Sequence, residues 1–147
     1  MACSRIPAPL RRFVIERARG CCEYCLLHQD DTAFAHHVDH VIALKHGGRT
    51  EEENLALACM ECNLHKGSDL AAIDPVEKVV VSLFNPRVQR WSEHFTVVNA
   101  SVVGTTPTGR ATAALLRMNE SARLLERQRL LTAGLYPHKG TNEKRIV

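Results

Sequence analysis

The residues best suited to chemistry lie between His36 and Lys66, in the segment HHVDHVIALKHGGRTEEENLALACMECNLHK. Asp39 and His40 are neighbours in a β-favouring run, so their side chains should point to opposite faces of a strand. Asn63 follows beside a C-x-x-C corner. Carboxylate and amide oxygens suit hard divalent cations, and an imidazole can take a proton from water near neutral pH. The segment therefore predicts a metal site with a general base beside it.

Local backbone signals predict the elements that position these side chains. A first strand should run over about 35–42, and its partner is expected around 55–59 or as an extended loop. Gly47-Gly48 predicts a turn after the first strand, and Thr50 with Glu53 predicts a capping box for a short helix. The helix that carries the last ligand should begin after the second cysteine pair. The expected unit is a hairpin followed by a helix.

The cysteines predict a zinc site rather than disulfides. Four of the six form two C-x-x-C pairs, made of Cys22, Cys25, Cys59 and Cys62. Without the apolar core of a secretion signal in MACSRIPAPLRR, two such pairs are typical of a tetrahedral zinc site with four thiolates. The 33 residues between the pairs exceed the usual zinc-ribbon spacing, and an inserted hairpin would account for the excess. Cys21 is an alternative ligand to Cys22, and Cys3 is predicted to be a spare thiol.

Several short motifs in this segment occur in an order that resembles the HNH endonucleases, the ββα-metal nuclease superfamily, in their zinc-binding four-cysteine branch. The motifs are Asp39-His40, Gly47-Gly48, Asn54-Leu55 and Cys59-x-x-Cys62-Asn63-x-x-Lys66. Each dipeptide alone would be uninformative, but their order and spacing over about thirty residues are specific. The resemblance is strongest from Cys22 to Lys66.

The resemblance implies a role for each matching residue. His40 corresponds to the catalytic His that activates water, and Asn54 to the middle Asn that braces the loop and orients His40. Asp39 and Asn63 correspond to the ligands of a catalytic divalent ion. Many relatives have His where this chain has Asn63, and an oxygen ligand there favours magnesium or manganese, although other divalent ions also fit.

Residues outside the core motif have supporting roles in this interpretation. His37 shares the strand face of Asp39 and is a candidate second-layer partner or extra ligand. His36, His46 and His65 are expected on the surface. The side chains predicted to contact substrate phosphate are Lys66, Arg87, Arg90, Arg110 and Arg117.

Charge is distributed unevenly along the chain, although the net charge is only +3. Residues 1–20 hold five Arg against one Glu, residues 21–66 hold three basic against eight acidic residues, and residues 67–147 hold eleven against seven. An acidic metal module between basic flanks suits a nuclease that binds DNA through its phosphates with weak sequence preference. Ordinary solvated helix and loop faces are the alternative explanation of this pattern.

The expected fold class is α+β, a zinc-stapled ββα module followed by a small α+β C-terminal lobe. The predicted division is 1–69 for the nuclease domain with its N-terminal helix, 70–136 for the accessory lobe and 137–147 for a flexible tail. Within the lobe, Val79–Val81 is predicted as a buried strand and 95–103 as a hairpin. Helices are expected from Thr106-Pro107 and over about 119–133.

The predicted function is a metal-dependent endonuclease that nicks or cleaves DNA by phosphodiester hydrolysis, with structural zinc and catalytic magnesium or manganese. The alternatives are a non-catalytic, zinc-stabilised nucleic-acid-binding module and an RNA-directed nuclease. The chain has no apolar run near the eighteen or so residues that span a bilayer, so a cytoplasmic protein without membrane partners is expected.

Overall fold

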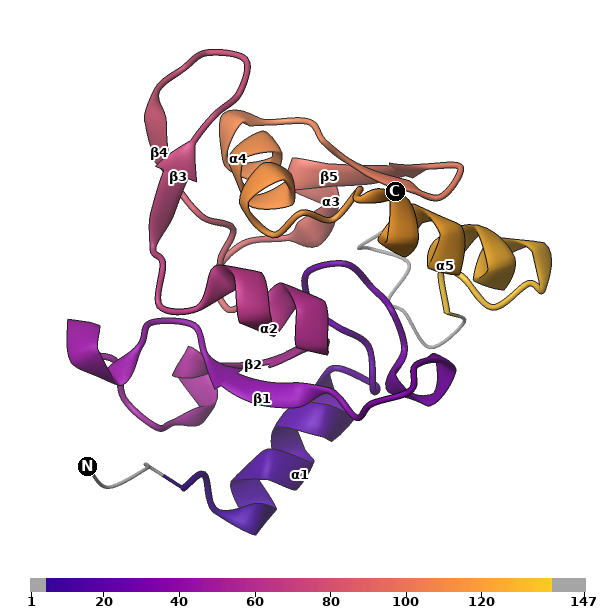
Figure 1. The fold of residues 1–147 in the computed structure, drawn as a ribbon. Helices are drawn as coiled ribbons and strands as arrows, with labels where there is room; N and C mark the ends of the chain where they lie inside the picture. The colour runs from indigo at the N-terminus through magenta and orange to yellow at the C-terminus, as the bar shows by residue number, and fades with distance from the viewer. Residues whose placement is uncertain (1–4, 139–147) are drawn as a thin grey trace.

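In the computed structural model, which describes residues 5–138, the segment with the catalytic candidates folds into an antiparallel hairpin followed by a helix (Figure 1). The elements of this unit are β1 (His37–His40), β2 (Leu55–Ala58) and α2 (Met60–Lys66). In the strand register, Asp39 lies opposite Ala56 and His40 opposite Leu55. The predicted strand–strand–helix order is confirmed, and β1 is two residues shorter at each end than expected.

The connection between the two strands differs from its prediction at one point. It contains two single-turn 3₁₀ helices, Leu44–His46 and Glu52–Asn54. The second begins after Glu51 and has no side-chain cap, so the predicted capping box of Thr50 and Glu53 is wrong. The Thr50 hydroxyl is instead within hydrogen-bond distance of His40. The 3₁₀ turn has Glu51 rather than Thr50 at its N-cap position, so Thr50 lies one residue too early to cap it.

An N-terminal helix, α1 (Ala8–Arg17), packs against the outer side of the hairpin. Val14 is fully buried in a small core with Val38 and Leu57 of the two strands. The N-terminal helix predicted from the sequence is therefore present and packed through one side, although Phe13 remains 39% exposed. The Arg17 guanidinium also donates to the Leu55 carbonyl at 2.7 Å, which ties the helix to the start of β2.

The C-terminal part contains two further hairpins and three helices, and it confirms the α+β class. Its elements are β3 (Ala71–Ile73), β4 (Val80–Ser82), α3 (Trp91–His94), β5 (Phe95–Val98), β6 (Ser101–Gly104), α4 (Pro107–Leu115) and α5 (Ser121–Thr132). β3 pairs with β4 and β5 with β6, both antiparallel. Thr106 caps α4 by accepting from the Gly109 N–H at 3.0 Å, as its sequence predicts. Both predicted helices are confirmed.

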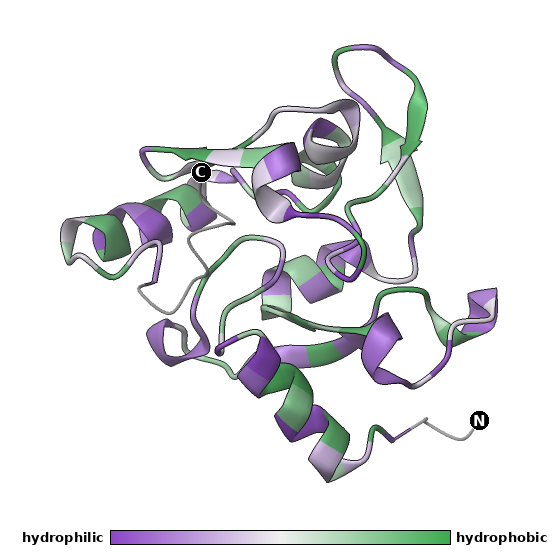
Figure 2. Ribbon diagram, turned by 180° about the vertical axis from the view of Figure 1, so that it is seen from behind, coloured by the Kyte–Doolittle hydropathy of each residue, from purple (hydrophilic) through white to green (hydrophobic). Residues whose placement is uncertain are grey.

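The strand predicted at Val79–Val81 forms one residue later as β4, but the prediction that it is buried is wrong. Val79 and Val80 are 48% and 71% exposed, because β4 pairs only with the short β3 in a two-stranded hairpin. Figure 2 shows hydrophobic residues along this hairpin, although it lies at the edge of the molecule. A run of valines favours a strand but does not decide which elements cover it.

One hydrophobic core joins the two predicted parts of the chain. Tyr24 of the cysteine-rich loop packs in the same buried cluster as Phe84, Trp91 and Leu116 of the C-terminal part. The predicted boundary near residue 69 remains a prediction. Cys3 and the predicted tail from residue 139 onward lie outside the described residues. Within residues 5–138, no helix combines the length and hydrophobicity needed to cross a membrane.

Candidate functional site

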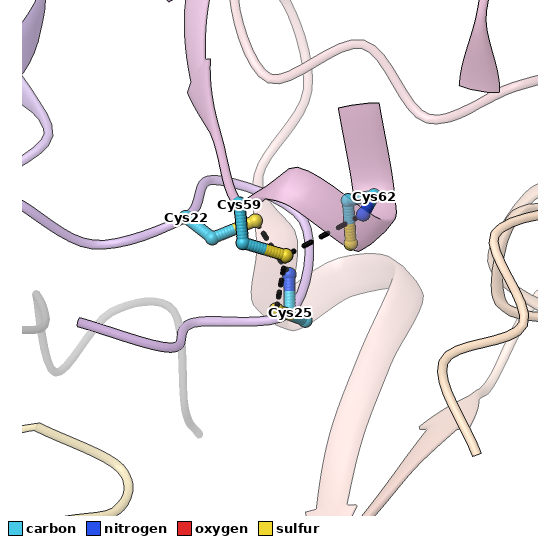
Figure 3. A group of neighbouring side chains, drawn as sticks. All are labelled: Cys22, Cys25, Cys59 and Cys62. Carbon is cyan, nitrogen blue, oxygen red and sulfur yellow. Dashed lines mark hydrogen bonds between the residues drawn. The ribbon is translucent and has the colours of Figure 1, made fainter. Parts of the chain in front are cut away.

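Four cysteine side chains converge where the loop after α1 meets the start of α2 (Figure 3). They are Cys22, Cys25, Cys59 and Cys62, all buried, with sulfur atoms within 4.8 Å of one another. In each pair the backbone N–H of the second cysteine donates to the sulfur of the first at 3.4 Å. The Cys59 sulfur thereby caps the N-terminus of α2. The β1–β2 hairpin lies between the pairs, which explains their long separation in sequence.

This sulfur arrangement fits a tetrahedral zinc ion. Zn–S bonds of about 2.3 Å place sulfurs about 3.8 Å apart, and the Cys25 and Cys59 sulfurs are 3.6 Å apart. All four cysteines are free of disulfides. Burial raises the pKa of the Cys22 thiol, so a cation is needed to hold its thiolate in the core. The four buried sulfurs therefore indicate a closed structural zinc site.

The second group of candidate functional side chains, Asp39, His40 and Lys66, lies at the end of β1 and on α2. The Nε2 atom of His40 shares a 2.8 Å hydrogen bond with the Thr50 hydroxyl. Lys66, at the end of α2, is 2% exposed, places its Nζ atom 3.8 Å from an Asp39 carboxylate oxygen and donates to the His40 carbonyl at 3.3 Å. The hairpin and α2 thus bring the Lys66 ammonium to the Asp39 carboxylate and to the backbone of His40.

Burial acts in opposite directions on the two charges of this group. Desolvation raises the pKa of the Asp39 carboxyl, and the nearby Lys66 ammonium partly offsets that rise. Desolvation also lowers the pKa of Lys66, partly offset by Asp39. Each charge is held in place by its partner and would gain from a further ligand of opposite sign. Such a pair suits a site that receives a cation at Asp39 and an anion at Lys66.

Asn54 braces the loop that follows β1. Its side chain is 8% exposed and accepts from the Ile42 N–H, while its amide donates to the Ile42 and Arg49 carbonyls, all at 2.9 Å. Gly48 completes the contact, because a Cβ there would lie 1.8 Å from the Ile42 carbonyl oxygen. The amide is directed into the loop backbone, so its contacts are those of a positioning residue for the segment around His40.

Replacing Asn54 with alanine is expected to lower the free energy of unfolding by about 1–3 kcal/mol, because two carbonyls and one N–H in part-buried hydrogen bonds lose their partner. Urea denaturation of the zinc-loaded chain measures the change. The control is Glu53→Ala at an exposed neighbouring position, expected to shift stability by less than about 0.5 kcal/mol. Equal unfolding midpoints for the two variants would argue against the bracing role.

The remaining metal-ligand candidates have clear positions. Asn63 is half-buried on α2 and lies three residues before Lys66, so the two share one helix face. His37 is exposed at the start of β1. The proposal that Asn63 joins Asp39 in holding an ion, with His37 as an extra partner, remains a prediction. His36 departs from its predicted surface position, because it is 8% exposed and its Nε2 contacts the Leu27 carbonyl at 2.7 Å.

The arginines predicted to contact phosphate differ in their accessibility. Arg87 forms a buried ion pair with Glu23. Arg110 binds Asp74 through two hydrogen bonds of 2.9 and 2.8 Å and holds the pKa of that carboxyl below its usual range. Both arginines are therefore already engaged with a carboxylate. The other two candidates, Arg90 and Arg117, are exposed.

A second cluster, His28, Asp31 and His138, also places potential ligand atoms within 4.8 Å of one another. Its geometry opposes a metal site. The Nδ1 atom of His28 already accepts from the Asp30 N–H at 3.0 Å, and the rings of His28 and His138 stack at 3.9 Å. Stacked rings direct their nitrogen lone pairs along parallel planes rather than toward one ion.

Two residues of the site could not be found from the sequence motifs. Thr50 was interpreted as a helix cap but contacts His40. Arg123 of α5 lies 3.1 Å from the Cys62 sulfur, although 61 residues separate the two. A threonine in a loop and an arginine on an amphipathic helix have ordinary local explanations, so only packing reveals these contacts.

Comparison with protein families adds one finding. Residues 22–69 match the family model described as HNH endonuclease, and the match spans both cysteine pairs, the β1–β2 hairpin and α2. No curated protein and no solved structure matches the chain. The match indicates a nuclease or another activity on nucleic acid for this segment, in agreement with the four-cysteine cluster.

Proposed function

We propose, on the premise that residues 22–69 match the HNH endonuclease family model, that the chain is a metal-dependent endonuclease that hydrolyses phosphodiester bonds of DNA. The observation that carries the proposal is the position of Asp39 and His40 as neighbours at the end of β1, with the His40 imidazole bonded to Thr50 and the Asp39 carboxylate 3.8 Å from Lys66. A module that only bound nucleic acid would have no need for this set of groups.

In the proposed reaction His40 is the general base. We assign its Nε2–H as the donor to the Thr50 hydroxyl, which leaves the Nδ1 lone pair to accept a proton from the attacking water. Asn54 holds the backbone of the following loop and thereby the end of the strand. Thr50 and Asn54 are positioning residues in this assignment, and only His40 takes the proton.

Asp39 and Asn63 are the proposed holders of the catalytic ion. Their carboxylate and amide oxygens favour magnesium or manganese over softer metals. Bound there, the ion would supply Lewis-acid stabilisation of the charge that develops on the phosphate and on the leaving oxygen. Lys66, whose ammonium group lies 3.8 Å from Asp39, is the proposed contact for a phosphate oxygen beside the ion.

The proposed substrate is DNA, bound mainly through its backbone. The basic residues of the two flanks support this choice, and of the predicted arginine contacts Arg90 and Arg117 are the exposed ones. Affinity should therefore fall steeply with salt and vary little with base sequence. Tight binding of one oligonucleotide that survives raised salt would contradict backbone-dominated recognition.

Supercoiled plasmid tests the function directly. Incubation of the zinc-loaded chain with Mg²⁺ or Mn²⁺ is expected to convert the plasmid to nicked or linear DNA, and omission of the ion is expected to prevent it. Single-stranded RNA in a parallel reaction tests the RNA-directed alternative. DNA binding without conversion under any divalent ion would establish the non-catalytic binding module instead.

A further inference from the structure

The feature that the nuclease assignment leaves unexplained is a buried arginine against the sulfur cluster. Arg123 extends from α5 and is 7% exposed. Its Nη2 atom lies 3.1 Å from the Cys62 sulfur and 3.7 Å from the Cys59 sulfur. Its Nη1 atom donates to the Leu116 carbonyl at 2.7 Å, which fixes the orientation of the guanidinium. A cation in the core needs a counter-charge or a full set of acceptors.

We propose that Arg123 is the counter-ion of the zinc centre and that, through it, α5 controls how tightly the zinc is held. Zn²⁺ with four thiolates has a net charge of about −2, and here that charge would be buried on all sides. A guanidinium that donates to two of the thiolates offsets part of this charge where water cannot. Hydrogen bonds to the sulfurs also reduce their tendency to take a proton and leave the metal.

A neighbour on the same helix separates this role from ordinary packing. Arg127, four residues later, is even more buried at 1% exposure. It donates to the Ala100 and Met118 carbonyls at 2.7 and 2.6 Å and to the Asn119 side chain at 3.0 Å, and it has no sulfur contact among the described hydrogen bonds. The two arginines dock α5 in the same manner, but only Arg123 reaches the metal centre.

The C-terminal segment also contacts the other cysteine pair. The Tyr136 hydroxyl, in a side chain only 3% exposed, donates to the Cys25 carbonyl at 2.8 Å. Arg123 therefore meets the Cys59–Cys62 pair and Tyr136 the Cys22–Cys25 pair. The segment from α5 to Tyr136 closes over the zinc site from a distant part of the sequence, which makes zinc retention depend on the docked lobe.

The test compares metal retention in three variants of the full zinc-loaded chain. Arg123→Met removes the positive charge and keeps a side chain of similar size. Arg123→Lys keeps the charge but loses the two-pronged guanidinium that can donate to two acceptors. Arg127→Met removes hydrogen bonds to backbone carbonyls and leaves the sulfur contacts in place. Transfer of zinc to a chromogenic chelator, measured below the unfolding transition, gives the affinity. Arg123→Met is expected to lower it by about 10–100-fold, the usual effect of losing an outer partner of a metal ligand, with Arg123→Lys intermediate. Arg127→Met, which removes docking contacts only, is expected to lower it clearly less, and an equal loss in the two Met variants would assign the effect to docking and overturn the counter-ion role.

A spectroscopic readout separates the counter-ion role from a purely structural one. With Co²⁺ in place of zinc, loss of the sulfur hydrogen bonds in Arg123→Met should shift the thiolate-to-cobalt charge-transfer band, whereas Arg127→Met should not. Equal zinc affinity and an equal cobalt spectrum in the parent and Arg123→Met would overturn the proposal. If Arg123→Met does not fold, Arg123→Lys gives the same comparison. Neither measurement depends on nuclease activity.

Discussion

Replacing His40 with alanine is expected to lower DNA turnover by about 10²–10⁴-fold, the contribution of a positioned general base. DNA binding and binding of the divalent ion should stay close to those of the parent, because the imidazole takes a proton but does not hold the ion in the proposed mechanism. The Nε2 atom of His40 bonds the side chain of Thr50. Because the lost bond joins two side chains, the variant should leave the hairpin backbone in place. Single-turnover kinetics on plasmid, with zinc content measured to confirm folding, provide the measurement.

The matched variant is Asp39→Ala, which should act on metal binding instead. Its loss of activity is expected to be partly recovered as Mg²⁺ or Mn²⁺ is raised, since Asn63 and the substrate phosphate can still hold an ion at high concentration. His40→Ala should show no such recovery. Rescue of His40→Ala by metal, or cutting at the parental rate, would make His37 the next candidate for the base.

Replacing Cys62 with alanine is expected to release the zinc and unfold the region around it. Structural zinc contributes an apparent binding free energy of about 10–16 kcal/mol in small zinc-dependent folds, whereas an ordinary domain is stable by only about 5–15 kcal/mol. All four cysteines belong to the core cluster that also contains Trp91 and Leu116. The unfolding should therefore extend into the C-terminal lobe, as circular dichroism and metal analysis would show.

Cys21→Ala is the control for the zinc ligands. Cys21 is also fully buried, but its sulfur donates weakly to the Arg19 carbonyl at 3.8 Å and lies outside the four-sulfur group. The variant should retain one zinc per chain and lose little stability. If Cys21→Ala loses zinc while Cys22→Ala keeps it, the assignment of ligands in the first pair is reversed. A folded, zinc-free chain would remove the structural role of the metal altogether.

The amino-acid sequence alone determined the unit that carries the chemistry. The Asp39–His40 pair, the glycine turn and the C-x-x-C corner before Asn63 predicted a hairpin and a helix, and these form as β1, β2 and α2. Such a unit can be predicted from the sequence because the signals that specify it are local. Strand alternation, turn glycines and ligand spacing act over a few residues, and the match to the HNH family covers the same segment.

Only the tertiary structure decided which polar side chains act together. Arg87 and Arg110 were equivalent to Arg90 and Arg117 in the sequence, yet the first two are committed to Glu23 and Asp74. The reason is that desolvation and pairing depend on which elements pack together, and no periodicity along one element encodes that.

The same holds for the side chains around the four-cysteine cluster and the proposed catalytic site. Thr50 meets His40 across a loop, and Arg123 meets Cys62 across 61 residues. Local patterns specify the chemistry that a side chain can perform. Long-range packing decides which partner it contacts. The sequence therefore determined the donor atoms of the proposed sites, and the fold decided which charges and hydroxyls surround them.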